Sequence, residues 1–316
     1  MKRVFIFIAI ASALLMGQTL QVKNVYPVQT MYKADFAFPR FSPDGAQLLF
    51  TQSNFRGLWL HDLNSGSTRQ INDHSGAGFE PCFSPDGREV YFRIDEWVRG
   101  RRFSSLAVQA LDSQEATLLI NRQRLLSPPR HVGAAQLAYT LGNTLQQQAL
   151  PATLTKKAPG DAASEIFAYV EPSNDVIVIS IDGRKQSLRP LAETGDERYL
   201  HASVGPDGEK LLFQIGGRGS YITDLEGNLL TELGVARAPQ WSPDGKWVVC
   251  MVDEDDGHRY TASEIWVVSS DGENRYQLTD SDKKIEMYPV WSPAMDRIAY
   301  HTISGHIEIM EIEINE

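Results

Sequence analysis

The chain has 316 residues, of which 42% are hydrophobic, so it is apolar enough to bury a core and is not a disordered chain. Its formal net charge is −10, from 30 basic and 40 acidic residues. A nucleic-acid-binding protein needs a basic surface to neutralise phosphates, so this charge argues against nucleic acid as a partner.

The first 17 residues have the pattern of a signal peptide. Lys2 and Arg3 form a short positive region, and an apolar run follows over residues 4–16. As a helix this run measures about 20 Å, too short for a hydrocarbon core of about 30 Å. Small residues suited to a peptidase follow, and the cut falls after Ala13 or Gly17. We therefore predict a signal peptide over 1–17 and a periplasmic or, alternatively, secreted mature chain; the other interpretation is a buried N-terminal helix.

A five-residue motif recurs along the rest of the chain. FSPDG stands at 41–45 and 83–87, WSPDG at 241–245, and the degenerate copies VGPDG and WSPAM at 204–208 and 291–295. A proline lies two residues before the aromatic residue in four copies, at Pro39, Pro81, Pro239 and Pro289. Short apolar runs follow the motifs at 48–50, 90–92, 211–213, 247–252 and 298–300.

The chemistry of the motif predicts a tight turn between two strands. The serine hydroxyl can accept a backbone N–H, proline presets φ near −65°, and glycine supplies the positive φ at the exit. A third strand and a more polar fourth strand follow in each unit, as in 58–63 and 67–72. Four short antiparallel strands repeated about every 42 residues are typical of a β-propeller blade.

The stretch from Pro128 to Ala202 lacks a clear motif, so the number of blades is open. Two blades there give seven, which we favour, and one gives six. The last unit lacks a fourth strand, which the alternating stretch 20–30 can supply, closing the ring in the last blade. We predict an all-β propeller of four-stranded antiparallel blades over 20–316.

Two cysteines, Cys82 and Cys250, lie in apolar strand patterns of different repeats. An exported protein with so few cysteines is not a disulfide scaffold. We expect two buried free thiols in preference to a disulfide.

The P-x-[WF]-S-P-D-G pattern resembles the WD-like repeat of TolB-type β-propellers, and it extends from Phe36 to the C-terminus. The resemblance implies a periplasmic propeller. Full TolB proteins also carry an α/β domain ahead of the propeller, which this sequence lacks, so the resemblance does not imply membership of the Tol–Pal system. The repeat is specific for the fold and unspecific for function.

In such a ring the first strand of each blade lines a central channel. The loops between blades share one face with the loops that join second and third strands, and we expect this face to bind a partner. A solvated rim without a ligand is the alternative. Mixed polar and aromatic groups suit an adaptable binding surface. The candidate binding residues are Phe79, Glu80, Trp97, Arg99, Arg101, Arg130, Tyr199, His201, Arg237, Glu286 and Tyr288.

Two longer loops carry opposite charge. RIDEWVRGRRFS at 93–104 combines a tryptophan with arginines, which suits an acidic protein or an anionic sugar. VDEDDGHRYTAS at 252–263 clusters carboxylates that are able to hold calcium, although the spacing is not that of an EF-hand. We expect a solvated acidic loop there.

The GxSxG, HExxH and P-loop motifs of common enzymes are missing from the sequence. We therefore expect a non-catalytic binding or scaffold propeller, without cofactor or metal, that presents its channel mouth to an envelope protein and has no membrane span in the mature chain. The alternative is a carbohydrate-active enzyme resembling oligogalacturonate lyases. That enzyme needs a metal at the channel mouth, with His201, His258, His301 and His306 as the candidate ligands.

Overall fold

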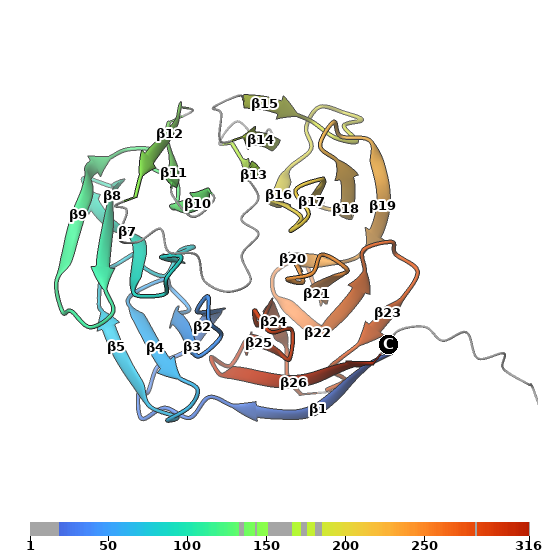
Figure 1. The fold of residues 1–316 in the computed structure, drawn as a ribbon, viewed down its shortest axis with the longest axis horizontal. Coiled ribbons are helices and arrows are strands. Elements are labelled where there is room, and N and C mark those ends of the chain that lie inside the picture. Colours follow the sequence, from blue (N-terminus) through green and yellow to red (C-terminus); the bar gives the residue numbers. More distant parts are fainter. Residues whose placement is uncertain are drawn as a thin grey trace, which may run out of the picture.

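The computed structural model describes residues 19–132, 136–142, 144–150, 166–171, 176–180, 185–281 and 283–315. All named elements of these residues are β-strands, grouped in antiparallel sheets that surround a central axis (Figure 1). The protein is therefore an all-β propeller, as the repeats predict. The predicted signal peptide lies outside the described residues.

Five sheets among the described residues have four strands. Four of the five take their strands in chain order. They are β2 (Phe36–Phe41), β3 (Gln47–Gln52), β4 (Leu58–Asp62) and β5 (Thr68–Asn72); β6 (Cys82–Phe83), β7 (Glu89–Val98), β8 (Arg101–Ala110) and β9 (Ala116–Gln123); β16 (Tyr199–Val204), β17 (Lys210–Ile215), β18 (Gly219–Asp224) and β19 (Leu229–Gly234); β20 (Arg237–Trp241), β21 (Trp247–Asp255), β22 (Tyr260–Ser269) and β23 (Arg275–Gln277).

The fifth four-stranded sheet joins the two ends of the described chain. It contains β24 (Glu286–Trp291), β25 (Arg297–Thr302), β26 (Ile307–Asn315) and, at its outer edge, β1 (Thr19–Pro27). β1 and β26 run antiparallel, with Thr19 opposite Asn315 and Pro27 opposite Glu308. The alternating N-terminal stretch is thus the outer strand of the sheet that holds the last strand of the chain.

Two sheets of three strands occupy the stretch without a turn motif. They are β10 (Arg130–Val132), β11 (Gln136–Leu141) and β12 (Thr144–Ala149), and β13 (Ile166–Val170), β14 (Val176–Ser180) and β15 (Lys185–Leu188). The two are separate sheets in the described chain, with no hydrogen-bonded pairing between them.

The recurring motif forms the predicted turn between the first and second strands. The Ser242 hydroxyl donates to Asp244 Oδ1 at 2.6 Å and accepts the N–H of Trp247 at 2.9 Å. Gly245 takes the positive φ of 72° and donates its N–H to the Ser242 carbonyl. The same serine–aspartate contact recurs at Ser42 and Ser84, and Ser292 makes a similar contact with Asp296, four residues further along. The serine therefore ties the turn to the strand that follows, as predicted.

The core lies between neighbouring sheets. Leu49 and Leu58 of one sheet pack with Phe92 of the next, and Trp247 and Tyr300 belong to a cluster shared by the β20–β23 and β24–β26 sheets. Cys250 is buried and Cys82 is half-buried, and both are free thiols. No helix long and apolar enough to cross a membrane was found among the described residues.

Candidate binding face at the channel mouth

A left-handed backbone position recurs at the start of the innermost strands. Five non-glycine residues there have a positive φ: Phe38 (55°), Glu80 (49°), His201 (54°), Ala238 (46°) and Tyr288 (50°). Strand register shifts at four of these places, which marks a β-bulge. Proline, which cannot donate to the ladder, follows in four of the five cases. A positive φ costs free energy in a residue with a Cβ. Its repetition at the same position of several sheets therefore points to a role for the side chains of these residues.

Aromatic side chains from several sheets meet at these bulges. The Phe38 ring lies 4.9 Å from Tyr288, 4.8 Å from Phe55 and 5.0 Å from His301, measured between ring centroids. Phe55 contacts Phe79 at 5.1 Å, and Tyr288 lies 6.4 Å from His201. We call this set the aromatic cluster: Phe38, Phe55, Phe79, His201, Tyr288 and His301. All of its members except His301 remain partly exposed, so they offer ring faces and edges to a ligand.

Charged groups line the next part of the mouth. Arg130 of β10 pairs with Glu80 at 3.1 Å. Burial alone would raise the pKa of Glu80, but Arg130 and Arg40 of β2 outweigh burial and hold it below its usual range. Burial lowers the pKa of His201, which favours the neutral form of its imidazole. The mouth therefore combines a fixed carboxylate between arginines with the imidazole of His201.

A second ion pair lies beside the aromatic cluster. Arg237 Nε of β20 is 2.8 Å from Oδ1 of Asp253, whose side chain is almost completely buried. Desolvation raises the pKa of Asp253 although Arg237 opposes the shift. Asp253 in turn contributes to the raised pKa of Tyr288, which burial dominates. The pair is therefore electrostatically coupled to the cluster.

The structure gathers six of the predicted site residues at this mouth: Phe79, Glu80, Arg130, His201, Arg237 and Tyr288. Trp97, Arg99 and Arg101 lie apart, exposed at the tip of the β7–β8 hairpin. Tyr199 is wholly buried, and its hydroxyl donates to the Pro190 carbonyl at 2.9 Å. Tyr199 is thus a core residue and not part of the rim.

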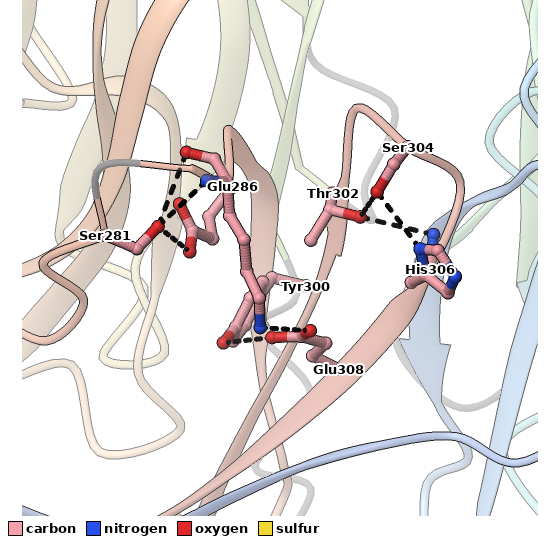
Figure 2. A network of polar contacts seen from close by, with 8 residues as sticks. Ser281, Glu286, Tyr300, Thr302, Ser304, His306 and Glu308 are labelled. Atoms are coloured by element: carbon pink, nitrogen blue, oxygen red, sulfur yellow. Dashed lines mark hydrogen bonds and ion pairs between the residues drawn. The ribbon is translucent and has the colours of Figure 1, made fainter.

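Glu286 is also buried, with 2% of its surface exposed. The Ser281 hydroxyl donates to Glu286 Oε1 at 3.0 Å (Figure 2). The Ser281 N–H donates to Glu264 Oε1 at 3.0 Å. Burial, with the nearby Glu264, raises the pKa of Glu286 to about 7. Glu286 therefore belongs to an interior carboxyl pair.

Sequence reasoning missed four residues of the mouth: Phe38, Arg40, Phe55 and Tyr260. His301 was considered only as a metal ligand of the lyase-like alternative, and Asp253 only as part of the acidic loop. Phe38 had a usable signal, because it precedes Pro39 as Tyr288 precedes Pro289. Phe55 and His301 lie in or next to loops, and no repeat position marks them.

The four histidines of the lyase-like alternative do not form one site. His201 and His301 both contact Tyr288, and His301 Nδ1 accepts the Phe38 N–H at 3.3 Å. His306 instead contacts the Ser304 hydroxyl at 3.0 Å (Figure 2), and His258 is exposed in the loop after β21. Within the described ranges, no three His, Cys, Asp or Glu residues are arranged to hold a metal ion.

Solved structures with a similar fold include two TolB-type proteins and one lyase. A protein provisionally assigned as TolB from Agrobacterium tumefaciens has 17% identity and a TM-score of 0.54, with 95% of this chain and 98% of that chain covered. TolB from Acinetobacter baumannii has 18% identity and a TM-score of 0.49, with 78% of this chain and 54% of that one covered, so this chain spans about half its length. An oligogalacturonate lyase in complex with manganese has 16% identity and a TM-score of 0.48, with 87% and 76% covered.

The sequence itself matches no family model and no curated protein. At such low identities the structural likeness concerns the fold alone. The chain has the TolB-like propeller fold that its SPDG repeats predict.

Proposed function

We propose that this protein is an exported, non-catalytic binding propeller whose channel mouth holds a segment of an envelope protein. The observation that carries the proposal is the repeated positive φ at Phe38, Glu80, His201 and Tyr288. This strained backbone conformation recurs where their side chains meet at the mouth. Export is proposed from the pattern of residues 1–17, and a periplasmic location follows from it.

The proposed ring has seven blades. Seven separate sheets occur among the described residues, five with four strands and two with three, and we take each as one blade. In this interpretation the pairing of β1 with β26 closes the ring. A closed ring holds the first strands at fixed positions, which favours binding because little conformational freedom is lost when a partner docks.

The chemistry of the mouth suits a peptide segment with an apolar side chain between polar groups. The rings of Phe38, Phe55 and Tyr288 offer apolar contact area. The Glu80–Arg130 pair and the partly exposed Arg237 guanidinium, held by the buried Asp253, offer oriented charges. Such an arrangement, with an aromatic centre and a polar rim, is typical of protein interfaces.

The proposal is tested by affinity capture from an envelope extract, with the wild-type chain and the single variants Tyr288→Ala and Phe55→Ala as baits. Truncation of an aromatic hot spot costs about 2 kcal/mol, so each variant should bind the captured partner at least about tenfold more weakly. Leu230→Ala is the control, because Leu230 is exposed on the outer strand β19. Circular dichroism checks that all variants fold.

Two results would count against the proposal. One is the absence of any specific partner for the wild-type chain. The other is a partner that binds the Tyr288→Ala and Phe55→Ala variants as tightly as it binds the Leu230→Ala control.

A further inference from the structure

The β7–β8 hairpin extends beyond the sheet to which it belongs. The strand β6 pairs with β7 only at Cys82–Tyr91 and Phe83–Val90, and β9 pairs with β8 no nearer the tip than Ser104. Residues 96–98 and 101–103 therefore pair only with each other. Arg99 and Gly100 close the hairpin with φ values of 50° and 73°, as in a two-residue type I′ turn. The tip is a two-stranded projection.

Both faces of this tip combine an apolar group with an arginine. Trp97 stands opposite Arg102, and Val98 stands opposite Arg101. Because successive side chains of a strand alternate between faces, the two pairs lie on opposite sides of the hairpin. Trp97 is 68% exposed and Val98 is 38% exposed. The protein's own body therefore covers neither face of the tip.

The tip is also a local concentration of positive charge on an acidic protein. Among the described residues, Arg99 and Arg101 form no ion pair. Arg122 and Arg124 add two guanidinium groups beside Phe103, with distances of 5.7 Å and 5.6 Å to its ring centroid. The nearby exposed carboxylate, Glu96, is paired with Arg122. The whole chain has a net charge of −10, so the positive charge of this tip is opposite in sign to that of the protein as a whole.

We propose that the tip of the β7–β8 hairpin docks on an anionic lipid bilayer. A bilayer surrounds an inserted tip on all sides, so it contacts the apolar group and the arginine on both faces at the same time. A protein partner contacts a tip mainly on one face, and a convex projection offers no groove for a peptide. Tryptophan is favoured at the headgroup level of membranes, and arginines are attracted to anionic headgroups.

This docking fixes the orientation of the ring. The β7–β8 turn joins a second to a third strand, so it lies at the mouth end, and Arg93 of the same hairpin stacks on Phe79 of the aromatic cluster at 4.7 Å. The mouth would therefore face the bilayer. The inference does not depend on whether the mouth binds a partner.

Co-sedimentation with vesicles tests the proposal. We expect the wild-type chain to bind vesicles of equal parts phosphatidylglycerol and phosphatidylcholine, and to bind phosphatidylcholine vesicles much more weakly. The double variant Arg99→Gln/Arg101→Gln should bind the anionic vesicles about thirtyfold more weakly. Trp97→Ala should weaken binding severalfold, because it removes the exposed aromatic ring.

The matched control is Arg88→Gln/Lys246→Gln. It removes the same charge from two exposed turns that join first to second strands, at the opposite end of the ring, and should leave binding unchanged. The proposal is overturned if the wild-type chain does not bind anionic vesicles, or if the control loses as much binding as the tip variant. It is also overturned if polyglutamate binds the tip while vesicles do not, because the partner is then an acidic protein.

Discussion

Two long hairpins at the mouth end, β7–β8 and β21–β22, carry opposite charge. Each contains a nearly buried aspartate near its base, Asp95 in the first and Asp253 in the second. The loop of the first carries Arg99 and Arg101, and the loop of the second carries Asp255 and Asp256. Two hairpins at the same end of the propeller thus present surfaces of opposite charge.

The two bases differ in their buried carboxyl groups. Asp95 accepts the Ser104 hydroxyl at 2.6 Å and lies 3.6 Å from Arg93 and 3.9 Å from Arg102. Asp253 has Arg237 as its ion-pair partner, and desolvation raises its pKa. Glu264 of the same hairpin lies next to the buried Glu286. Both bases therefore pair a buried aspartate with an arginine, and the acidic side differs in having a second buried carboxyl, Glu286, whose pKa is raised to about 7.

The largest effect should come from breaking the pairing on the basic side. Arg93→Ala leaves the buried Asp95 without its nearest guanidinium and removes the donor to the Leu126 carbonyl at 3.1 Å. We expect the free energy of unfolding, measured with urea, to fall by about 3–5 kcal/mol. Arg102→Ala, at a half-exposed side chain, should cost less than about 1 kcal/mol. If both substitutions lowered the free energy of unfolding by the same amount, the buried ion pair would matter no more than the exposed one, and the prediction would be wrong.

The acidic side should show the stronger dependence on pH. The folded protein binds the Glu286 proton more tightly than the unfolded chain does, because its pKa rises from 4.5 to about 7. This contribution to stability is present below pH 4.5 and is lost as the pH rises through about 7, a loss of about 3 kcal/mol. Glu286→Gln, which mimics the protonated acid, should remove this loss and leave the variant more stable than the wild type at pH 8.

The measurement is the free energy of unfolding of both proteins from pH 4 to pH 8. Glu254→Gln, at an exposed position of the β21–β22 hairpin, is the control and should follow the wild-type curve. A Glu286→Gln curve parallel to that of the wild type would mean that the pKa of Glu286 is the same in the folded and the unfolded chain.

A smaller effect should be equal in the two blades. Ser84 and Ser242 make the same contacts in the turns at the opposite end of the ring, each to an aspartate and to a backbone N–H at 2.9 Å. Ser84→Ala and Ser242→Ala should each lower the free energy of unfolding by about 1 kcal/mol. A difference above about 1 kcal/mol between them would mean that the two blades differ in more than their hairpins.

The smallest effect concerns the exposed ion pair of the basic hairpin. Glu96 pairs with Arg122, and both side chains are about half exposed. Glu96→Gln should change the free energy of unfolding by less than about 1 kcal/mol, and the difference should shrink further in high salt. A loss as large as that of Arg93→Ala would show that the hairpin depends on its surface charges for folding.

The local parts of this structure were predictable because their causes are local. The SPDG turns need a hydroxyl, a preset φ and a glycine at fixed spacing, so Ser42, Ser84 and Ser242 make the contacts that their neighbours imply. Alternation of apolar residues also predicted the outer strand β1. The six predicted residues that meet at the mouth follow from their common position before the first strands.

The rest required knowledge of how distant strands pack. Phe38 and His301 are in contact although they lie in different sheets, and nothing near either residue in the sequence indicates the other. Glu286 and Tyr199 begin first strands, but their side chains point into the interior. A shift of one residue reverses the direction of every side chain on a strand, and the bulges introduce such shifts.

The partnership of β1 with β26 has a consequence for the order of folding. Thr19 lies opposite Asn315, so this sheet joins the first and last strands of the described chain. Among the described strands β1 is synthesised first, and it stays without its partner β26 until all of the intervening sheets have been synthesised. Contacts between such distant segments pay the full loop-closure entropy and form late. The unpaired edges of β1 are therefore the surfaces that a newly made chain has to protect the longest.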